Sequence, residues 1–264
     1  YTLWHTLSLH DALPISCTLE QRYRSRDGVV RWSPEPPGVV TDGLTGGPGL
    51  ARRAVLAPFV RDGRVDYDAL VTRLDLDALY RELAVRELAG AGRAEQLAFY
   101  LNAYNLLVLY QVRERLRREP AWRGPVSLFD KLRFFLLARH RVAGRDLNLL
   151  SLENRVIRRG FREPRIHFAL NCASSSCPHL PGSLFVAETL EEDLEQLTGA
   201  FINSDEVRYD AASHTLTVSP IFRWYRRDFA PSVPAFIARY REVPQDAALR
   251  FGTYDWRLNR VADR

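Results

Sequence analysis

The sequence predicts a helix-rich α+β fold with a small, mainly antiparallel sheet in its C-terminal half. Apolar residues recur at helical spacing through much of residues 51–161. The later stretch "EVRYDAASHTLTVS" (206–219) has the pattern of two strands joined by a turn. Hydrophobic residues make up 46% of the chain and aromatic residues 11%, which is enough for a packed core.

In the first half, the pattern predicts mostly helices. "GRVDYDAL" (63–70) indicates a turn and a short strand that enters a helix. "LAFYLNAYNLLVLY" (97–110) is apolar all round, so it predicts the buried centre of a long helix that Pro120 ends. Its 14 residues fall short of a membrane span. Ser127 is a plausible N-cap. Helices are expected over residues 51–60, 69–83, 94–119, 127–138 and 150–161.

The second half mixes both kinds of element. "RIHFALN" (165–171) is short, apolar and bounded by Pro164 and a turn-rich loop, and it predicts a buried strand. A helix with acidic residues in its first turn is expected over 189–204. A hairpin over 206–219, helices over 220–229 and 234–243, and a strand with a polar tail over 249–259 complete the chain.

The N-terminal residues do not resemble protein sequence. Residues 1–15, "YTLWHTLSLHDALPI", reverse-translate to one reading frame of a common short-read sequencing adapter. We expect them to be an artefact and the chain to be a fragment, and we set them aside. Residues 16–50 are rich in turn formers and predict a linker or disordered extension. Residues 51–264 are expected to form a single globular domain.

The positive charge comes from arginine. The formal net charge is +5, and Lys131 is the one lysine among the 37 basic residues. The arginines are scattered among acidic residues. Codon bias in a GC-rich genome, which replaces lysine by arginine throughout a chain, explains this pattern. No clear signal for nucleic-acid binding or for a membrane follows from them.

Several stretches together resemble domain-of-unknown-function family 547. They are "GRVDYDAL", "EQLAFYLNAYNLLV", the Glu-Asn and Ile-Arg of "LSLENRVIRRGF", "EPRIHFALNCASSSCP", "SPIFRWYRRDF" and "YDWRLN", in the family's order over about residues 51–260. The resemblance implies no assigned activity. Because bacterial members often look exported, it implies a periplasmic or exported protein. Two positions depart from the family: Asn154 stands where His is common, and His179 where Pro is common.

The stretch "RIHFALNCASSSCPHLPG" (165–182) holds the candidate chemistry. A catalytic cysteine needs a base at about 3 Å and a group that orients the base. In an extended chain, His167 and Cys172 would lie about 16 Å apart and point to opposite faces. Their pairing therefore requires a bend at Asn171. Cys177 has an easier route, because "ASSS" can fold the loop back.

Other residues qualify as partners of this site. Asn105 or Asn102, three apart on one helix face, or Asp255 would orient the base. Glu153 would serve as an acid/base partner or form a salt bridge. Both asparagines must find hydrogen bonds in so apolar a helix, and the alternative to catalysis is that they bind loop backbone groups.

Two further interpretations of the cysteines remain open. A Cys172–Cys177 disulfide would close a six-residue loop and stabilise the fold by roughly 2 kcal/mol in an oxidising compartment. Zinc bound by His167, Cys172, Cys177 and His179 is disfavoured, because all four ligands fall within 13 residues. No other cofactor is expected.

Two function classes follow. The first is a hydrolase or transferase that acts on an acyl or amide bond, with Cys177 or Cys172 as nucleophile, His167 as base and Asn105 as orienting group. The second is a non-catalytic binding or scaffold module with a disulfide-stapled loop. In the second, the arginine-aromatic stretch "FRWYRRDF" (222–229) would meet a protein or an anionic glycan.

Overall fold

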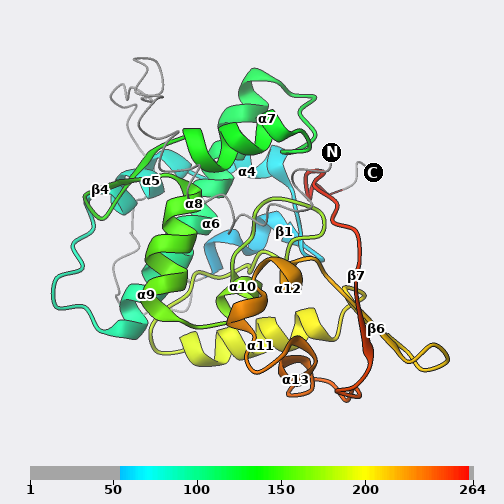
Figure 1. Cartoon of the computed structure of the whole chain (residues 1–264). Coiled ribbons are helices and arrows are strands. Elements are labelled where there is room, and N and C mark those ends of the chain that lie inside the picture. Colours follow the sequence, from blue (N-terminus) through cyan, green and yellow to red (C-terminus); the bar gives the residue numbers. More distant parts are fainter. Residues whose placement is uncertain (1–53, 262–264) are drawn as a thin grey trace. The chain divides into compact units, whose positions relative to one another are not determined.

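The computed structural model describes residues 54–261, which cluster into two compact units. The larger unit contains residues 54–198 and 255–261, and the smaller one contains residues 199–254. Figure 1 shows the chain, and each unit is treated by itself. The adapter-like segment 1–15 and the expected linker 16–50 lie outside the described residues. The single domain expected over residues 51–264 stays a prediction.

The larger unit begins with several short elements, of which the two helices α4 and α5 each have an aspartate as N-cap. The 3₁₀ helix η1 (Ala54–Phe59) is followed by the antiparallel pair β1 (Val60–Arg61) and β2 (Arg64–Val65). Two helices follow in place of the continuous one expected over 69–83, namely α4 (Tyr67–Arg73) and α5 (Leu76–Val85). The break arises because the Asp75 carboxylate accepts the backbone N–H of Ala78 and so begins a new helix.

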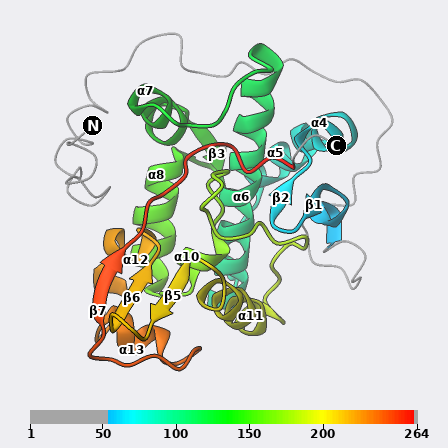
Figure 2. The same ribbon diagram turned by 90° about the vertical axis from the view of Figure 1, so that its right-hand side faces the viewer.

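Helix α6 (Arg93–Arg118) forms the centre of the larger unit (Figure 2). Every residue from Leu97 to Tyr110 is buried, as the apolar pattern predicts. The helix ends just before Pro120, also as predicted. No helix within residues 54–261 is long and apolar enough to cross a membrane.

The segment after α6 contains two π-helical stretches and an unexpected hairpin. Helix α7 (Leu128–Lys131) has the predicted cap, since the hydroxyl of Ser127 accepts the N–H of Asp130. It continues into η2 (Leu132–Leu137), and α8 (Leu149–Ser151) continues into η3 (Leu152–Arg158) and α9 (Arg159–Phe161). Between these helices, β3 (His140–Val142) pairs antiparallel with β4 (Arg145–Leu147).

The strand predicted over residues 165–171 is wrong, because the chain forms the short helix α10 (Ile166–Ala169) there. All four residues of α10 are buried, so neither helical nor strand periodicity shows in the sequence. The carboxylate of Glu163 accepts the backbone N–H of Arg165 and supports the first turn. Pro164 therefore precedes a helix and not a strand.

The smaller unit contains a three-stranded sheet with short helices. Strands β5 (Val207–Asp210) and β6 (Thr215–Val218) form the predicted antiparallel hairpin (Figure 2). Strand β7 (Ala248–Phe251) pairs parallel with β6, so the sheet is mixed. The helices are α12 (Ile221–Trp224), η4 (Arg226–Asp228) and α13 (Val233–Ile237), and α11 (Leu190–Ile202) leads into this unit from the larger one.

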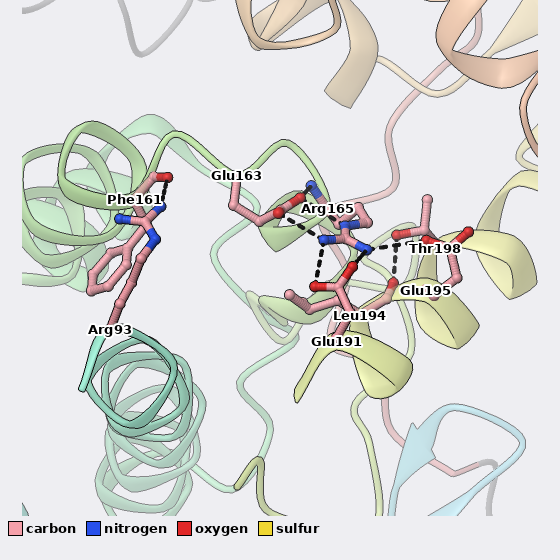
Figure 3. A network of polar contacts seen from close by, with 8 residues as sticks. All are labelled: Arg93, Phe161, Glu163, Arg165, Glu191, Leu194, Glu195 and Thr198. Carbon is pink, nitrogen blue, oxygen red and sulfur yellow. Dashed lines mark hydrogen bonds and ion pairs between the residues drawn. The ribbon is translucent and has the colours of Figure 1, made fainter. Parts of the chain in front are cut away.

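A cluster of charges around Arg165 fixes the start of α10 in the larger unit (Figure 3). The guanidinium donates to both carboxylate oxygens of Glu163, each at 2.8 Å. It also donates to Glu191 at 2.6 and 3.0 Å and to Glu195 at 3.1 Å. These bonds hold the pKa of Arg165 above its usual value and lower that of Glu191. The side chain of Arg165 thus ties α10 to α11.

We expect Arg165→Ala to lower the free energy of unfolding by about 1–2 kcal/mol. Arg165 forms bidentate hydrogen bonds to Glu163 and Glu191, which strengthen the ion pairs. The side chain of Glu191 is 82% exposed, however, so solvent screens its contribution to stability. Arg165→Lys should lose most of the same stability, because an ammonium cannot form the fork. Urea denaturation measures both variants. As a control, Arg141→Ala, which removes an exposed 4.0 Å pair with Asp146, should change stability by less than about 0.5 kcal/mol.

Candidate thiol site

The loop that follows α10 folds back on itself and brings the two cysteines together. The Asn171 side-chain oxygen accepts the N–H of Ala173 at 2.9 Å, and Ala173 has a left-handed backbone with φ of 62°. The N–H of Cys177 then donates to the carbonyl of Ser174 at 3.0 Å. The chain therefore has the bend at Asn171 that a His167–Cys172 pair would require, and Cys177 returns by the route that the "ASSS" turn allows.

The two sulfur atoms are in contact. The Cys177 thiol donates to Sγ of Cys172 at 2.7 Å, and the backbone N–H of Cys172 donates to Sγ of Cys177 at 2.8 Å. The hydroxyl of Ser174 lies 3.3 Å from Sγ of Cys172. In this structure Cys172 and Cys177 are not joined by a disulfide, and both are half-buried. Each sulfur thus accepts one hydrogen bond, and each cysteine residue is partly exposed.

The pKa values of two side chains, Lys131 and Tyr67, are affected by electrostatic interactions with the cysteines. Burial lowers the pKa of Lys131, and the nearby Cys172 thiolate opposes that shift. The ammonium of Lys131 also lies 4.0 Å from the centre of the Trp256 ring. Burial raises the pKa of Tyr67 well above its usual value, and Cys172 and Cys177 raise it further. The amine of Lys131, which carries a positive charge when protonated, therefore interacts electrostatically with Cys172.

The side-chain amides of two buried asparagines in α6 bind backbone groups of neighbouring loops. Asn105 donates to the carbonyl of Ala169 and accepts the N–H of Asn171, both at 2.9 Å. Asn102 bonds the backbone of Phe185 in the same two-sided way, at 2.8 and 2.9 Å. Both side chains of α6 thus bind loop backbone groups, which is one of the two roles expected for them.

A second chain of polar groups runs below the loop. Asn171 donates to the carbonyl of Pro178 at 2.7 Å and accepts from Asn259 at 3.4 Å. Asn259 in turn accepts the hydroxyl of Tyr67 at 2.7 Å. The thiol loop is therefore coupled to α4 and to the C-terminal segment through buried side chains.

The C-terminal segment, residues 255–259, lies along the loop as an extended strap. Ser175 donates its N–H to the carbonyl of Arg257 at 2.7 Å, and Ser176 donates to that of Asp255 at 3.3 Å. The N–H of Asn259 donates to the carbonyl of Ala173 at 3.0 Å. The carboxylate of Asp255 is bound by Arg257, which lowers its pKa. Asp255 thus contributes its backbone and an ion pair to the site.

The other predicted site residues have different surroundings. His167 lies in α10 and is 4% exposed, so its ring is not open to solvent. Glu153, in η3, is buried and accepts the hydroxyl of Tyr104 at 3.2 Å. His179 is exposed and packs on Gly63, where an added Cβ would come within 2.1 Å of the imidazole.

Of the four ligands of the zinc alternative, Cys172 and Cys177 are in contact. Within residues 54–261, no group of three or more His, Cys, Asp or Glu side chains is placed to hold a metal ion. His167 and His179 stand on opposite sides of the loop in sequence, the first in a buried helix and the second on the surface.

Sequence reasoning missed four residues of the site, namely Lys131, Tyr67, Ser174 and Asn259. Tyr67 and Asn259 belong to the stretches "GRVDYDAL" and "YDWRLN", and Ser174 is part of the "ASSS" turn. Lys131 carries a signal that was available, since it is the one lysine in an arginine-rich chain. Lysine presents a compact ammonium group where arginine presents a planar guanidinium, so Lys131 differs chemically from every other basic residue of the chain apart from histidine.

The comparisons with known proteins bear on the same part of the chain. A family model described as "protein of unknown function, DUF547" matches residues 88–202, which include α6, α10 and the thiol loop. No curated protein and no solved structure matches the chain. The resemblance seen in the sequence is confirmed over this segment, because residues 88–202 match the model of the DUF547 family.

Proposed function

We propose that the loop carrying Cys172 and Cys177 is the active site of a thiol-dependent hydrolase or transferase that acts on an acyl or amide bond. Cys172 is the nucleophile. The observation that carries this assignment is the contact of one sulfur with both the Cys177 thiol at 2.7 Å and the Ser174 hydroxyl at 3.3 Å. The electrostatic interaction of Cys172 with Lys131 supports it.

The surroundings of Cys172 favour its thiolate form. A thiol donor and a neighbouring ammonium both stabilise a negative sulfur, and a thiolate is the reactive form of cysteine. The Cys177 thiol donates its proton toward Sγ of Cys172, so the charge on one sulfur affects the proton affinity of the other. His167 is the base expected from the sequence, but its ring is buried, and we assign the activation of the thiol to Lys131 instead.

The reaction proceeds by covalent catalysis. The Cys172 thiolate forms a bond to the carbonyl carbon of the substrate, and the bond from that carbon to its oxygen or nitrogen leaving group breaks. The leaving group takes a proton from the Lys131 ammonium or from water. Water, or an acceptor amine or hydroxyl, then attacks the thioester carbon, gives its proton to the neutral Lys131 amine or to water, and the carbon–sulfur bond breaks to release the thiolate. The first outcome is hydrolysis and the second is transfer.

Alkylation of the native protein by iodoacetamide, followed by peptide mass mapping, tests the assignment. We expect Cys172 to react faster than Cys177 and to reach half its maximal rate below pH 8.5, the ordinary pKa of cysteine. Lys131→Met should slow the reaction at pH 7 by about three- to tenfold, because the thiolate fraction falls with the lost cation. Lys131→Arg keeps the charge and should restore most of the rate. Slow alkylation of both cysteines at neutral pH would contradict the assignment.

The non-catalytic alternative is favoured by the same sulfur contact. Loss of two protons and two electrons to an oxidant such as a small disulfide would join Cys172 to Cys177 and staple the loop, since their sulfurs already touch. The exposed Arg226 and Arg227 of η4 would then offer an anion-binding surface to a protein or glycan. Recovery of the two cysteines as one oxidised pair from protein folded under native conditions would favour this module over the enzyme.

A further inference from the structure

We propose that the acyl group transferred by the thiol site carries an extended apolar chain, which binds to exposed side chains at the start of α7. This inference rests on the proposed function and names its substrate class. The surface in question, here called the α7 patch, consists of Val126, Leu128 and Phe129.

The α7 patch is an unusual concentration of exposed apolar surface. Val126 is 48% exposed, Leu128 49% and Phe129 66%. Within residues 54–261, five large hydrophobic side chains are exposed, and these three fall within four consecutive positions. Leaving such side chains in water is unfavourable, and clustered examples are typical of binding surfaces.

The α7 patch adjoins the thiol pair through Lys131. Leu128 and Lys131 are three residues apart in α7, so they share a helix face. The Lys131 ammonium lies 4.0 Å from the centre of the Trp256 ring, and the carbonyl of the neighbouring residue Arg257 accepts the N–H of Ser175 in the thiol loop. One face of α7 thus leads from an exposed apolar side chain to the cation beside the nucleophile.

The backbone at Gly124 fixes the chain leading into α7 against the strap that covers the thiol loop. Gly124 has φ of +102°, and an added Cβ would come within 2.6 Å of the Leu258 nitrogen and 2.7 Å of the Trp256 carbonyl oxygen. Leu258 also donates its N–H to the carbonyl of Arg123 at 2.7 Å. The chain that leads into the α7 patch and the thiol loop therefore both contact the C-terminal segment, residues 255–259.

The size and charge of this surface favour an acyl chain over a protein partner. A stable protein interface needs roughly 800 Å² on each side and 20–30 residues, and three side chains in one short segment fall far below that. A chain of several methylenes matches three adjacent apolar side chains. Lys131 would face the polar head of such a substrate, where the carbonyl must lie for Cys172 to attack.

Two series of probes of increasing chain length test the inference on the full chain. N-alkylmaleimides from ethyl to octyl report the alkylation of Cys172, and acyl thioesters from acetyl to octanoyl report turnover. Relative to a free small thiol, we expect the rate constants to rise about tenfold across each series, since part of each added methylene leaves water. Leu128→Ser and Phe129→Ser should flatten both series. Val85→Ser, which changes a 76% exposed side chain on α5, should leave them unchanged.

The outcomes separate the two proposals. If Cys172 reacts and turns over thioesters without dependence on chain length, or if the dependence survives in both α7 variants, the apolar-chain inference is wrong and the enzyme assignment stands. If Cys172 is unreactive toward every maleimide and no thioester is consumed, the enzyme assignment fails and the inference fails with it.

Discussion

Replacing Asn105 by alanine is expected to lower the free energy of unfolding by about 3 kcal/mol. The Asn105 amide is 3% exposed and pairs with the carbonyl of Ala169 and the N–H of Asn171, where α10 turns into the thiol loop. Without it, two buried backbone groups lose their partners, at a cost of about 1–3 kcal/mol each, partly relieved if water enters.

Urea denaturation of Asn105→Ala measures this loss. The control Thr72→Ala removes an exposed hydroxyl that bonds to its own helix backbone, and it should cost less than about 0.5 kcal/mol. The loop of the Asn105 variant should also be looser. Under conditions where the variant remains folded, we therefore expect the difference in alkylation rate between Cys172 and Cys177 to shrink. A loss of stability below about 1 kcal/mol would show that the two backbone groups find other partners.

The helices of the larger unit could be predicted because their signals are local. The long apolar run of α6 and the Ser127 cap of α7 each lie within one stretch of sequence. The β3–β4 hairpin was not predicted, because its turn residues Ala143 and Gly144 lack the usual Asn-Gly or Asp-Gly signature. Ala143 adopts a left-handed backbone conformation with φ of 46°, which alanine rarely does, so its residue type does not predict the turn.

In the candidate site, too, features that depend on neighbouring residues can be anticipated from the sequence, and features that depend on distant segments cannot. The bend at Asn171 and the contact of the two cysteines arise within residues 171–177, so the sequence could offer both as alternatives. The cation beside Cys172 and the strap at residues 255–259 depend on how distant segments pack. Burial of His167 also depends on tertiary packing, since the short run that contains it forms a helix where a strand was expected.

A second buried histidine makes the larger unit sensitive to pH. His140, in β3, is 3% exposed, and among the described residues neither of its ring nitrogens has a hydrogen-bond partner. Its neighbours are the rings of Tyr80 and Tyr110, at 5.7 and 6.2 Å between centres. Burial in these surroundings lowers the pKa of His140 to about 4. The folded chain therefore resists a proton that the unfolded chain accepts near pH 6.5.

We expect His140 to cost the larger unit roughly 3 kcal/mol of stability as the pH falls from 6.5 to 4. In that window the unfolded state binds about one more proton than the folded state, so the free energy of unfolding decreases with falling pH. The contribution is fully present above pH 6.5 and declines no further below about pH 4. His140→Phe keeps an aromatic ring between the two tyrosines and removes the proton site. The variant should therefore lose less stability than the parent in this window.

Hydrogen exchange of the α6 amides, followed from pH 4 to 8, measures this difference in the unit that contains His140. The matched control is Val142→Ala, which trims a fully buried side chain of the same strand. It should lower stability by a similar amount at every pH, about 1–2 kcal/mol, because a lost methyl pair carries no proton. Parallel pH profiles for the parent and His140→Phe would show that the imidazole is protonated in the folded chain near its ordinary pKa, and that its burial exerts no penalty.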